Sequence, residues 1–376
     1  MIAGAVGRPL CGMKQNLTET ITLLNRTLAP DFRLMPLYTP DCPVFLAVAW
    51  PGSDGVTGLR PRLPAGRGLT LQQALVAAGA EAVELRASLA QRHLTALADL
   101  PRENGLAMVV ATDLHSGDTV RIPAQAVYLD CADQLCEPVI VDAGSTGCAA
   151  GATLQDARMA GLWECIERDA VALWWHGGLP GGALSLEVID RLQPRLFWWL
   201  NGRDRQTRLL DLATDIRLPV VAAVSSDPGG GRVAVGTAAR PVLADAALAA
   251  VTEMIQTEVG MAEARLAQDP EVLLWDARGS TRRQPQFAPA PDRAPPPPPL
   301  PLPPPLPPVA EGADLIARLA EMGHRVLAVE LTLPTDPLPS VRVIVPGLCA
   351  MGGRIDTDRF HRLCPHNPSP CMPEPY

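Results

Sequence analysis

The stretch "GATLQDARMAGLWECIERDAVALWW", Gly151 to Trp175, places three charged side chains in the most apolar helical segment of the chain. Glu164 and Glu167 are three residues apart and Arg168 follows directly, so a helix carries all three near one face. Burying charge is costly unless the charge is paired or holds a metal ion. The stretch therefore predicts a buried helix whose charged side chains have a specific task.

The same pattern occurs at two other places in the chain, and such repetition is informative. The segment "GLTLQQALVAAGAEAVE" aligns without a gap on "GATLQDARMAGLWECIE", and "LADAALAAVTEMIQ" is a weaker third copy. All three share L-x-x-A-x-x-A-x-x-x-E-x-x-(E/Q). The paired positions are Glu81 and Glu84, then Glu164 and Glu167, then Glu253 and Gln256. Three alanine-rich helices with solvated glutamates remain the alternative, but the common offset of the glutamates favours a common role.

The repeated pattern indicates how the three helices would pack and what they would hold. Leu and Ala at every third position form a small-residue face that can pack closely on a sheet or on a sister helix. If the helices pack together, five carboxylates and one amide converge, and like charges at short range require compensation. Carboxylate oxygens suit Mg²⁺, which usually shares its coordination with nucleotide phosphates. We therefore expect a site for Mg²⁺ and a triphosphate.

Two common nucleotide-binding folds are excluded by motif. The sequence contains neither GxxxxGK[ST] nor GxGxxG, so the site would be neither a P-loop nor a dinucleotide fold. The segment "GGGR", Gly229 to Arg232, predicts a hairpin turn rather than a phosphate-binding loop.

The composition is that of a globular protein. The chain has 376 residues, of which 47% are hydrophobic, enough for one large domain or several with a proper core. The net charge of −8 argues against a general nucleic-acid binder, because such binding depends on lysine and arginine. No apolar run approaches the roughly 20 residues of a membrane-spanning helix. We expect neither nucleic acid nor a membrane as a partner.

The cysteines and histidines do not form a metal-binding pattern. Nine cysteines are scattered along the chain without a CxxC, and the six histidines form neither HxH nor HExxH. Cys131 and Cys136 lack a second ligand pair, so a zinc site is not expected. Reduced thiols in a cytoplasmic protein are the simplest interpretation.

A proline-rich stretch divides the chain. The segment "APAPDRAPPPPPLPLPPPLPPVAEG" lacks most backbone donors, so we expect an exposed spacer or loop insertion, with an SH3-type ligand as the alternative. Apolar runs on both sides predict strands, and Ala/Leu-rich runs predict helices, which gives a mixed α+β fold in layers. The predicted strands are "VFLAVAW", "LAMVVATDL", "QAVYLD", "LPVVAAVSS", "HRVLAVELTL" and "SVRVIVPGL", and "ADLIARLAEMG" is a predicted helix.

The pattern resumes after the prolines, so we treat them as an insertion within one fold. The chain then divides into a main part, 1–284, a proline-rich insertion, 285–312, a C-terminal part of the same fold, 313–363, and a proline-rich tail, 364–376.

At these residues the chain resembles the YcaO superfamily, whose members are ATP-dependent enzymes that activate backbone amides of peptides. The segment "GSTGCAAGATLQDARMAGLWECIERDAVALWW" resembles the central S-N-G-x-A-x-G-N-T-x-x-E-A…E-x-x-E-R-D block of that family. The segments "GRGLTLQQALVAAGAEAVELRAS" and "ALAAVTEMIQTE" resemble its S-x-x-E-x-x-E-R and A-L-x-E-x-x-Q helices. "VELTLPTDPLPSVRVIVPGL" is similar to a segment near the family C-terminus.

The resemblance implies a fold with helices packed on sheets around a nucleotide cleft, and ATP and Mg²⁺ bound by the carboxylate helices. It implies metal-binding roles for five residues, namely Glu81, Glu84, Asp156, Glu164 and Glu167. It implies cofactor-binding roles for Arg168, Glu253 and Gln256 as well, and it makes Glu164, Glu167 and Arg168 the catalytic residues, with Arg168 as the phosphate contact.

Four positions depart from the family pattern. Ala78 stands where the first motif has Ser, and Leu85 stands where it has Arg. Ala152 replaces the Asn of G-N-T, and Asp156 replaces the Glu that follows. The first three changes replace polar side chains with apolar ones, and the fourth shortens the side chain of a predicted metal ligand.

The resemblance implies a peptide cyclodehydratase that forms thiazolines and oxazolines. A Cys, Ser or Thr of the precursor peptide attacks the preceding amide carbonyl, and ATP phosphorylates the amide oxygen so that it leaves as phosphate. The substrate supplies the nucleophile, so Cys148 is expected to be a small buried residue rather than a catalyst. Thioamide or amidine formation is one alternative, and a catalytically degenerate subunit that binds a partner or leader peptide is another.

The partners implied are a ribosomally synthesised precursor peptide and a separate leader-peptide-recognition protein, E1-like or ocin-ThiF-like. That expectation rests on the sequence showing no separate leader-binding domain beside the YcaO-like region. A homodimer is left open by the sequence.

Overall fold

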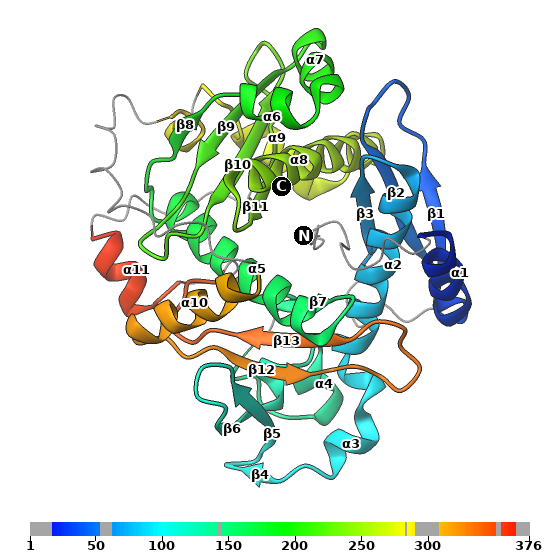
Figure 1. Ribbon diagram of the computed structural model, residues 1–376, viewed down its shortest axis with the longest axis vertical. Helices are drawn as coiled ribbons and strands as arrows, with labels where there is room; N and C mark the ends of the chain where they lie inside the picture. Colours follow the sequence, from blue (N-terminus) through cyan, green and yellow to red (C-terminus); the bar gives the residue numbers. More distant parts are fainter. Residues whose placement is uncertain are drawn as a thin grey trace.

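The computed structural model describes residues 17–52, 62–141, 144–282, 284–289, 308–350 and 355–365. Three antiparallel sheets, each with a long helix packed on it, form the molecule (Figure 1). We refer to them as the first, second and third units in the order of their long helices along the chain.

The first unit is a three-stranded sheet covered by two helices. Its strands are β1 (Phe32–Leu37), β2 (Phe45–Pro51) and β3 (Ala65–Gly68), in the order β1-β2-β3, and its helices are α1 (Leu17–Leu28) and α2 (Leu71–Ser88). The helix α2 packs on β2 and β3, and α1 packs on α2. The buried side chains between them form one hydrophobic cluster.

The second unit is a six-stranded sheet that carries the helix α5 (Leu154–Trp175). Its strands are β4 (Arg102–Glu103), β5 (Leu106–Asp113), β6 (Thr119–Pro123), β7 (Cys148–Ala150), β12 (Leu327–Glu330) and β13 (Ser340–Ile344). The order is β4-β5-β12-β13-β7, with β6 also paired to β5. The helix α5 packs on β7 and β13.

The third unit is a four-stranded sheet covered by the helix α8 (Leu243–Leu266). Its strands are β8 (Gly182–Leu184), β9 (Gln206–Asp211), β10 (Val220–Ser226) and β11 (Ala234–Ala239), in the order β11-β10-β9-β8.

Shorter elements connect the three units. They are η1 (Ala90–Arg92), α3 (Leu94–Ala98), η2 (Ala124–Ala126), α4 (Cys131–Leu135), α6 (Glu187–Leu192), α7 (Pro194–Gly202), α9 (Pro270–Arg278), η3 (Pro285–Phe287), α10 (Pro308–Glu321) and α11 (Asp358–Leu363).

The three copies of the sequence pattern form the three long helices α2, α5 and α8. Each follows a strand of its own sheet, namely β3, β7 and β11. The helices α2 and α5 begin with capping boxes, in which the Thr70 and Thr153 hydroxyls accept from the third residue of each helix. The helix α8 begins at Leu243, and its N-cap residue, Val242, supplies no side-chain hydrogen bond.

The small-residue faces of the helices pack against glycines of the sheets, as the pattern predicts. A Cβ atom on Gly66 of β3 would lie 2.1 Å from the backbone nitrogen of Ala78 in α2. A Cβ atom on Gly236 of β11 would likewise lie 2.1 Å from the backbone nitrogen of Met254 in α8. Backbone approach this close requires glycine on the strand and small residues on the helix.

The segment after the proline-rich stretch completes the second unit. The strand β12 lies between β5 and β13, and β13 pairs with β7, so strands from both sides of the prolines form one sheet. Phe287 of η3 is fully buried against Trp174 and Trp175. The expected insertion, 285–312, therefore begins with the residues of η3 and ends within the first turns of α10. Residues 290–307 of that insertion and 366–376 of the tail lie outside the described residues.

Five of the six predicted strands are confirmed and one is wrong. The segment "QAVYLD" forms the turn η2 and an irregular stretch rather than a strand. The buried Gln125 side chain donates to Glu137 and Pro138 and accepts from the Ile140 amide. These hydrogen bonds tie the segment to the stretch after α4 instead of to a neighbouring strand. The predicted turn at Gly229–Arg232 joins β10 to β11, and the Gly231 amide donates to the Asp227 carboxylate at 2.7 Å.

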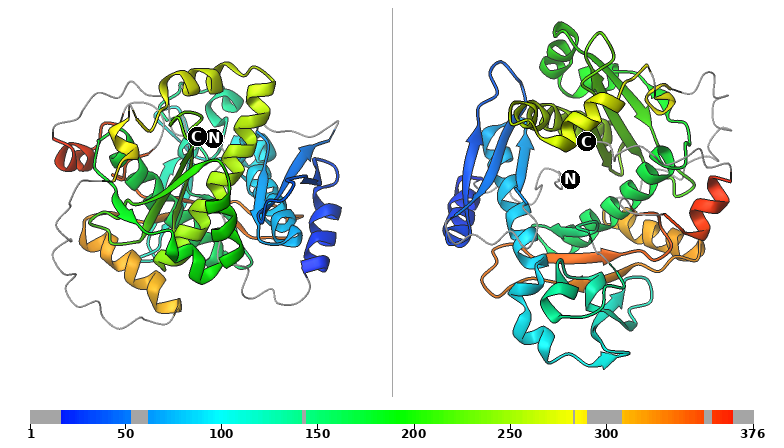
Figure 2. Two further views of the ribbon diagram at one scale, coloured as in Figure 1. Left: turned by 90° about the horizontal axis from the view of Figure 1, so that it is seen from above. Right: turned by 180° about the vertical axis from the view of Figure 1, so that it is seen from behind.

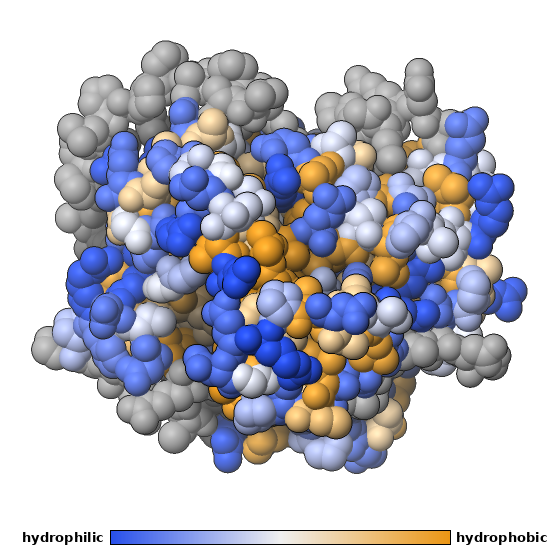
Figure 3. Space-filling model, turned by 90° about the horizontal axis from the view of Figure 1, so that it is seen from below, coloured by the Kyte–Doolittle hydropathy of each residue, from blue (hydrophilic) through white to orange (hydrophobic). Residues whose placement is uncertain are grey.

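The surface of the second unit carries exposed apolar side chains among polar ones. Figure 3 shows this face of the molecule, and Figure 2 shows the units from above and from behind. The exposed apolar residues of β5 and of the stretch after α4 are Val110, Val139, Ile140 and Val141. Within the described ranges, no helix is both long enough and apolar enough to cross a membrane.

We expect Gly236→Ala to lower the free energy of unfolding by about 1–3 kcal/mol, because the added methyl group would collide with the backbone of α8. Gly260→Ala is the matched control, since Gly260 lies in α8 with open space at its Cβ position and alanine favours a helix by about 0.5–1 kcal/mol. Urea unfolding of both variants checks this, and equal stability of the two would contradict the packing described.

Candidate functional site

The long helices of the three units bring the predicted carboxylates toward one another. The helices α2, α5 and α8 face the middle of the molecule in both front and rear views (Figures 1 and 2). Glu81 of α2 interacts electrostatically with Glu164 of α5 and with Glu253 of α8. Glu84 interacts with Glu164 as well. We call Glu81, Glu84, Glu164, Glu167, Glu253 and Gln256 the carboxylate cluster.

In the second unit, Glu167 is fixed and Glu164 is held more loosely. Glu167 accepts hydrogen bonds from Arg168 Nη1 at 3.0 Å, from Thr237 Oγ1 at 2.7 Å and from the Ala239 amide at 3.1 Å. Glu164 accepts from the Gly147 amide at 3.2 Å and lies 3.7 Å from Arg168. Glu167 thus joins α5 to β11 of the third unit.

In the third unit, the pair on α8 is bound by an arginine from the first unit. Arg67 Nη2 of β3 lies 2.7 Å from Glu253 Oε2, and Arg67 Nη1 donates to Gln256 Oε1 at 3.2 Å. The Arg67 side chain is only 2% exposed. This contact joins the first unit to the third.

In the first unit, the carboxylates on α2 are the least satisfied of the cluster. The Oε2 atom of Glu81 is buried and has no hydrogen-bond partner. A buried acceptor without a donor is costly, so this atom is available to a ligand that the protein itself does not supply.

Burial raises the pKa values of four glutamates of the cluster. It raises the pKa of Glu81 to about 8, although Arg67 lowers it in part. It raises the pKa values of Glu164 and Glu253 to about 7, with Arg168 and Arg67 respectively opposing the shift. The pKa of Glu84 also lies well above its usual value, because of burial and then Glu164. Additional positive charge would therefore be bound favourably here.

These side chains fit Mg²⁺ bound together with a nucleotide. The donors are carboxylate oxygens, which Mg²⁺ prefers, and one of them has no partner in the protein. In the part of the chain that is described, no three His, Cys, Asp or Glu side chains form a metal-binding group by themselves. The remaining ligands would thus be phosphate oxygens and water, as is usual for Mg²⁺.

Asp156, also predicted as a metal ligand, lies in the first turn of α5. Its Oδ2 atom accepts from the Thr153 amide at 3.1 Å and from the Thr153 hydroxyl at 2.8 Å, closing the capping box of α5. It is exposed and precedes Glu164 by about 12 Å along the helix axis. The structure therefore places the other seven predicted residues in or beside the cluster, and it places Asp156 in the cap of α5.

Sequence reasoning missed several cationic and polar residues that surround the cluster. Arg342 of β13 is 6% exposed, donates to Gly144 O at 2.6 Å and Cys148 Sγ at 3.1 Å, and lowers the pKa values of Glu84 and Glu164. Arg240, which follows β11, stacks on Trp163 at 5.8 Å. The sequence feature that could have identified these residues is an arginine inside or beside an apolar strand, as in "SVRVIVPGL", because a buried arginine requires a charged or polar partner.

Cys148 is 1% exposed, and it pairs across the sheet with Arg342. It is therefore a small buried side chain of β7, as expected from the sequence.

The departure at Leu85 has a clear structural outcome. Leu85 is 8% exposed and belongs to the hydrophobic core of the first unit. The next residue, Arg86, is bound by Asp31 and by Asp336. The helix α2 therefore has no counterpart of Arg168 beside its two glutamates, and Arg67 and Arg342 act on them from strands.

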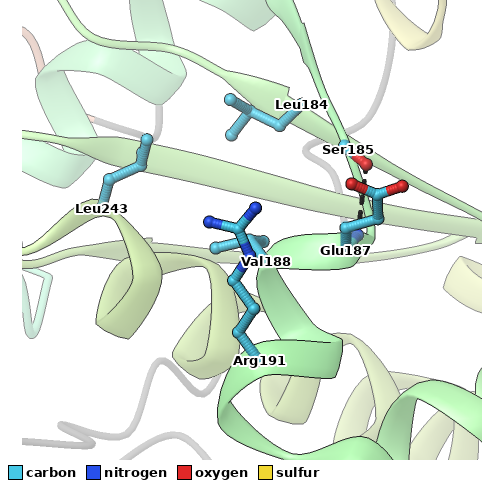
Figure 4. A pocket seen from close by; sticks show the side chains of 6 residues that line it. All are labelled: Leu184, Ser185, Glu187, Val188, Arg191 and Leu243. Atoms are coloured by element: carbon cyan, nitrogen blue, oxygen red, sulfur yellow. Dashed lines mark hydrogen bonds between the residues drawn. The ribbon is translucent and has the colours of Figure 1, made fainter.

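A pocket of about 200 Å³ lies away from the cluster. It is lined by Leu184, Ser185, Glu187, Val188, Arg191 and Leu243, and Figure 4 shows the Arg191 guanidinium among these side chains. The Glu187 amide donates to Ser185 Oγ at 3.2 Å. None of the carboxylate-cluster residues lines this pocket, so it is not the candidate site.

The chain is similar to several proteins of known structure. It superimposes with a TM-score of 0.73 on a heterocyclase in complex with substrate and cofactor, at 21% identity, over 96% of this chain and 56% of that chain. It also matches the YcaO from Methanopyrus kandleri bound with AMPPCP and Mg²⁺, with a TM-score of 0.62, 22% identity, and coverage of 89% and 91%. The E. coli microcin synthetase McbBCD complex matches with a TM-score of 0.61, 16% identity, and coverage of 85% and 88%.

These likenesses establish the fold. The expected α+β arrangement of helices on sheets is thereby confirmed. The chain spans about half the length of the heterocyclases that it matches, 56% of one and 43% of the heterocyclase TruD.

Sequence comparison agrees with the structural matches. An uncharacterized protein in the tfuA 3' region of Rhizobium leguminosarum bv. trifolii is 27% identical over 335 residues, with 75% of this chain and 76% of that protein covered. Residues 89–349 match the profile of a family described as YcaO cyclodehydratase, ATP- and Mg²⁺-binding. Because this match covers well over half of the chain, the protein belongs to the YcaO family of ATP- and Mg²⁺-binding cyclodehydratases.

Proposed function

We propose that this protein activates backbone amides of a ribosomally synthesised precursor peptide with ATP and Mg²⁺, and that it closes Cys, Ser or Thr side chains into thiazolines or oxazolines. The observation that carries the proposal is the meeting of Glu81, Glu164 and Glu253, from three separate units, in one largely buried cluster. Membership in the YcaO family supports the same conclusion.

In this proposal the carboxylate cluster holds Mg²⁺ and the arginines orient phosphate. Glu81, Glu84, Glu164, Glu167 and Glu253 would bind the metal, with Gln256 beside them on α8. ATP with Mg²⁺ supplies the phosphoryl group that turns the amide oxygen into a leaving group. Asp156 stays a proposed ligand on the strength of the family motif alone.

Arg168 is suited to contact the phosphates. Its guanidinium is buried and fixed by Glu167, with Thr237 at 3.4 Å. A guanidinium that is already held in place approaches phosphate oxygens with little further loss of side-chain freedom, and its charge stabilises the negative charge that develops during transfer. We propose that Arg168 neutralises charge on the transferring phosphoryl group.

The nucleophile belongs to the peptide, so the protein needs to bind and orient the substrate rather than supply an attacking group. An amide oxygen leaves poorly as hydroxide and well as phosphate. The same activation would serve thioamide or amidine formation, in which a different nucleophile attacks. Product mass separates thioamide formation, which replaces oxygen with sulfur, from azoline formation, which removes one water. Amidine formation also removes one water, so fragmentation of the product, which locates the altered residues, separates it from azoline formation.

A catalytically degenerate subunit is the second candidate, and specific positions favour it. Ala78 and Leu85 are buried in the core where the family motif has polar side chains, so no polar group reaches the cluster from them. Absence of nucleotide binding and of phosphate release, alone and with its partner, would favour this candidate.

We propose two partners, the precursor peptide and a separate leader-peptide-recognition protein. Among the structural relatives, the microcin synthetase is a complex, McbBCD, that has been seen with pro-MccB17 bound. Recovery of the full rate of modification by the isolated chain would contradict the need for a recognition partner.

We expect Glu164→Gln to lower ATP turnover by roughly 10²–10³-fold, because the substitution removes one carboxylate from the proposed metal site. Melting temperature should stay close to that of the parent protein, since Glu164 makes only one direct hydrogen bond in the structure besides its ion pair with Arg168. Phosphate release with the peptide and its partner is the measurement. Glu187→Gln, in the remote pocket, is the matched control, and full activity of Glu164→Gln would refute the assignment.

The raised pKa values predict a pH dependence for the protein without ligand. Glu81, Glu164 and Glu253 bind protons more tightly in the folded state, so the folded state carries more protons between about pH 4.5 and 8. Stability of the free protein should therefore fall as the pH rises through this range.

Binding of Mg²⁺ and nucleotide should show the opposite trend, because the carboxylates must lose their protons to bind the metal. We expect the increase in melting temperature on adding Mg²⁺ and AMPPCP to grow between about pH 6 and 8. A thermal-shift series across this range measures both trends, and a ligand effect that is independent of pH would contradict the assignment.

A further inference from the structure

Arg67 is a buried arginine that connects two of the repeated units. It lies in β3, just before α2, and is buried. Its guanidinium lies 2.7 Å from Glu253 and 3.2 Å from the amide oxygen of Gln256 on α8. It therefore contacts both members of the third E-x-x-(E/Q) pair from a neighbouring unit.

The sequence "GRG" explains why this side chain points to α8. Added Cβ atoms on Gly66 and Gly68 would lie 2.1 Å from Ala78 and 2.4 Å from Gln73, so both glycines face α2. Successive residues of a strand point to opposite faces, so Arg67 leaves β3 from the face opposite to the one on which the two glycines meet α2. The strand β3 also contacts α8. Two glycines thus seat the strand on one helix while the arginine between them reaches the other.

The charge distribution indicates what Arg67 does. In α5, Arg168 pairs with Glu164 and Glu167 within the same helix. In α2, the corresponding residue is Leu85, which is buried in the core. Arg67 supplies positive charge between α2 and α8 instead, since it lowers the pKa values of both Glu81 and Glu253.

We propose that Arg67 is a positioning residue of the nucleotide site. It holds Glu253 and Gln256 on the side of α8 that faces Glu81, so that α2 and α8 bind the same Mg²⁺–nucleotide complex. The inference rests on the proposed function for the identity of that ligand. Arg67 acts through the residues it holds and contacts no reacting atom.

The test is calorimetric binding of AMPPCP with Mg²⁺ to the full chain and its variants. Arg67→Gln should weaken binding roughly 10–100-fold, as loss of a group that orients metal ligands usually does. Arg67→Lys should recover part of the loss, because it keeps the charge but not the two-pronged contact. The matched control is Arg62→Gln. Arg62 precedes Arg67 by five residues and pairs with Asp130, so this variant loses an ion pair of another kind and should bind AMPPCP as the parent does.

A double-mutant cycle distinguishes positioning from general support of the fold. In a Glu253→Gln background, Arg67→Gln should weaken binding by less than about threefold, because its target is already altered. If Arg67→Gln lowers stability to urea but leaves AMPPCP binding unchanged, the inference is overturned. Equal losses in both backgrounds would overturn it as well.

The outcomes also separate this inference from the proposed function. If the parent chain binds AMPPCP and shows the expected Arg67 effects but modifies no peptide, the proposed chemistry fails and the positioning role stands. If the parent chain binds no nucleotide, the positioning role is refuted together with the nucleotide site.

Discussion

The structure depends on one constraint, the burial of several carboxylates in a single cluster. Glu81 of α2 interacts electrostatically with Glu164 of α5 and with Glu253 of α8 in the largely buried space between the three helices. Like charges so placed favour protonation unless cations balance them. Each contributing helix must therefore be held firmly against the repulsion, and each must have a cation within reach.

The three units satisfy this constraint by the same construction. Each long helix follows a strand of its own sheet, and in the first and third units a strand glycine lets the helix pack closely. The cations come from different places, with Arg168 on α5 and Arg67 and Arg342 on strands. The units are joined through the same charges, since Arg67 reaches α8 and Glu167 accepts from Thr237 and Ala239 at β11.

The sequence allowed much of this site to be predicted, because the pattern is local. The spacing of Glu164 and Glu167, and its repetition at Glu81 and Glu253, identified the helices and their facing residues. The arginines on strands could not be found this way, since Arg67 and Glu253 are 186 residues apart in sequence. The family motif predicted Asp156 as a metal ligand, and the structure shows it in the capping box of α5. The segment "QAVYLD" has the composition of a strand, but the contacts of Gln125 with the stretch after α4 make it a connector.

The most direct test of the account is the position of the metal itself. Crystals grown with AMPPCP and Mn²⁺, a metal with similar preference for oxygen ligands, would reveal the ion by its anomalous scattering. The account predicts manganese between α2, α5 and α8, coordinated by carboxylates of at least two of these helices and by phosphate oxygens. Metal and nucleotide bound away from Glu81, Glu164 and Glu253 would contradict it.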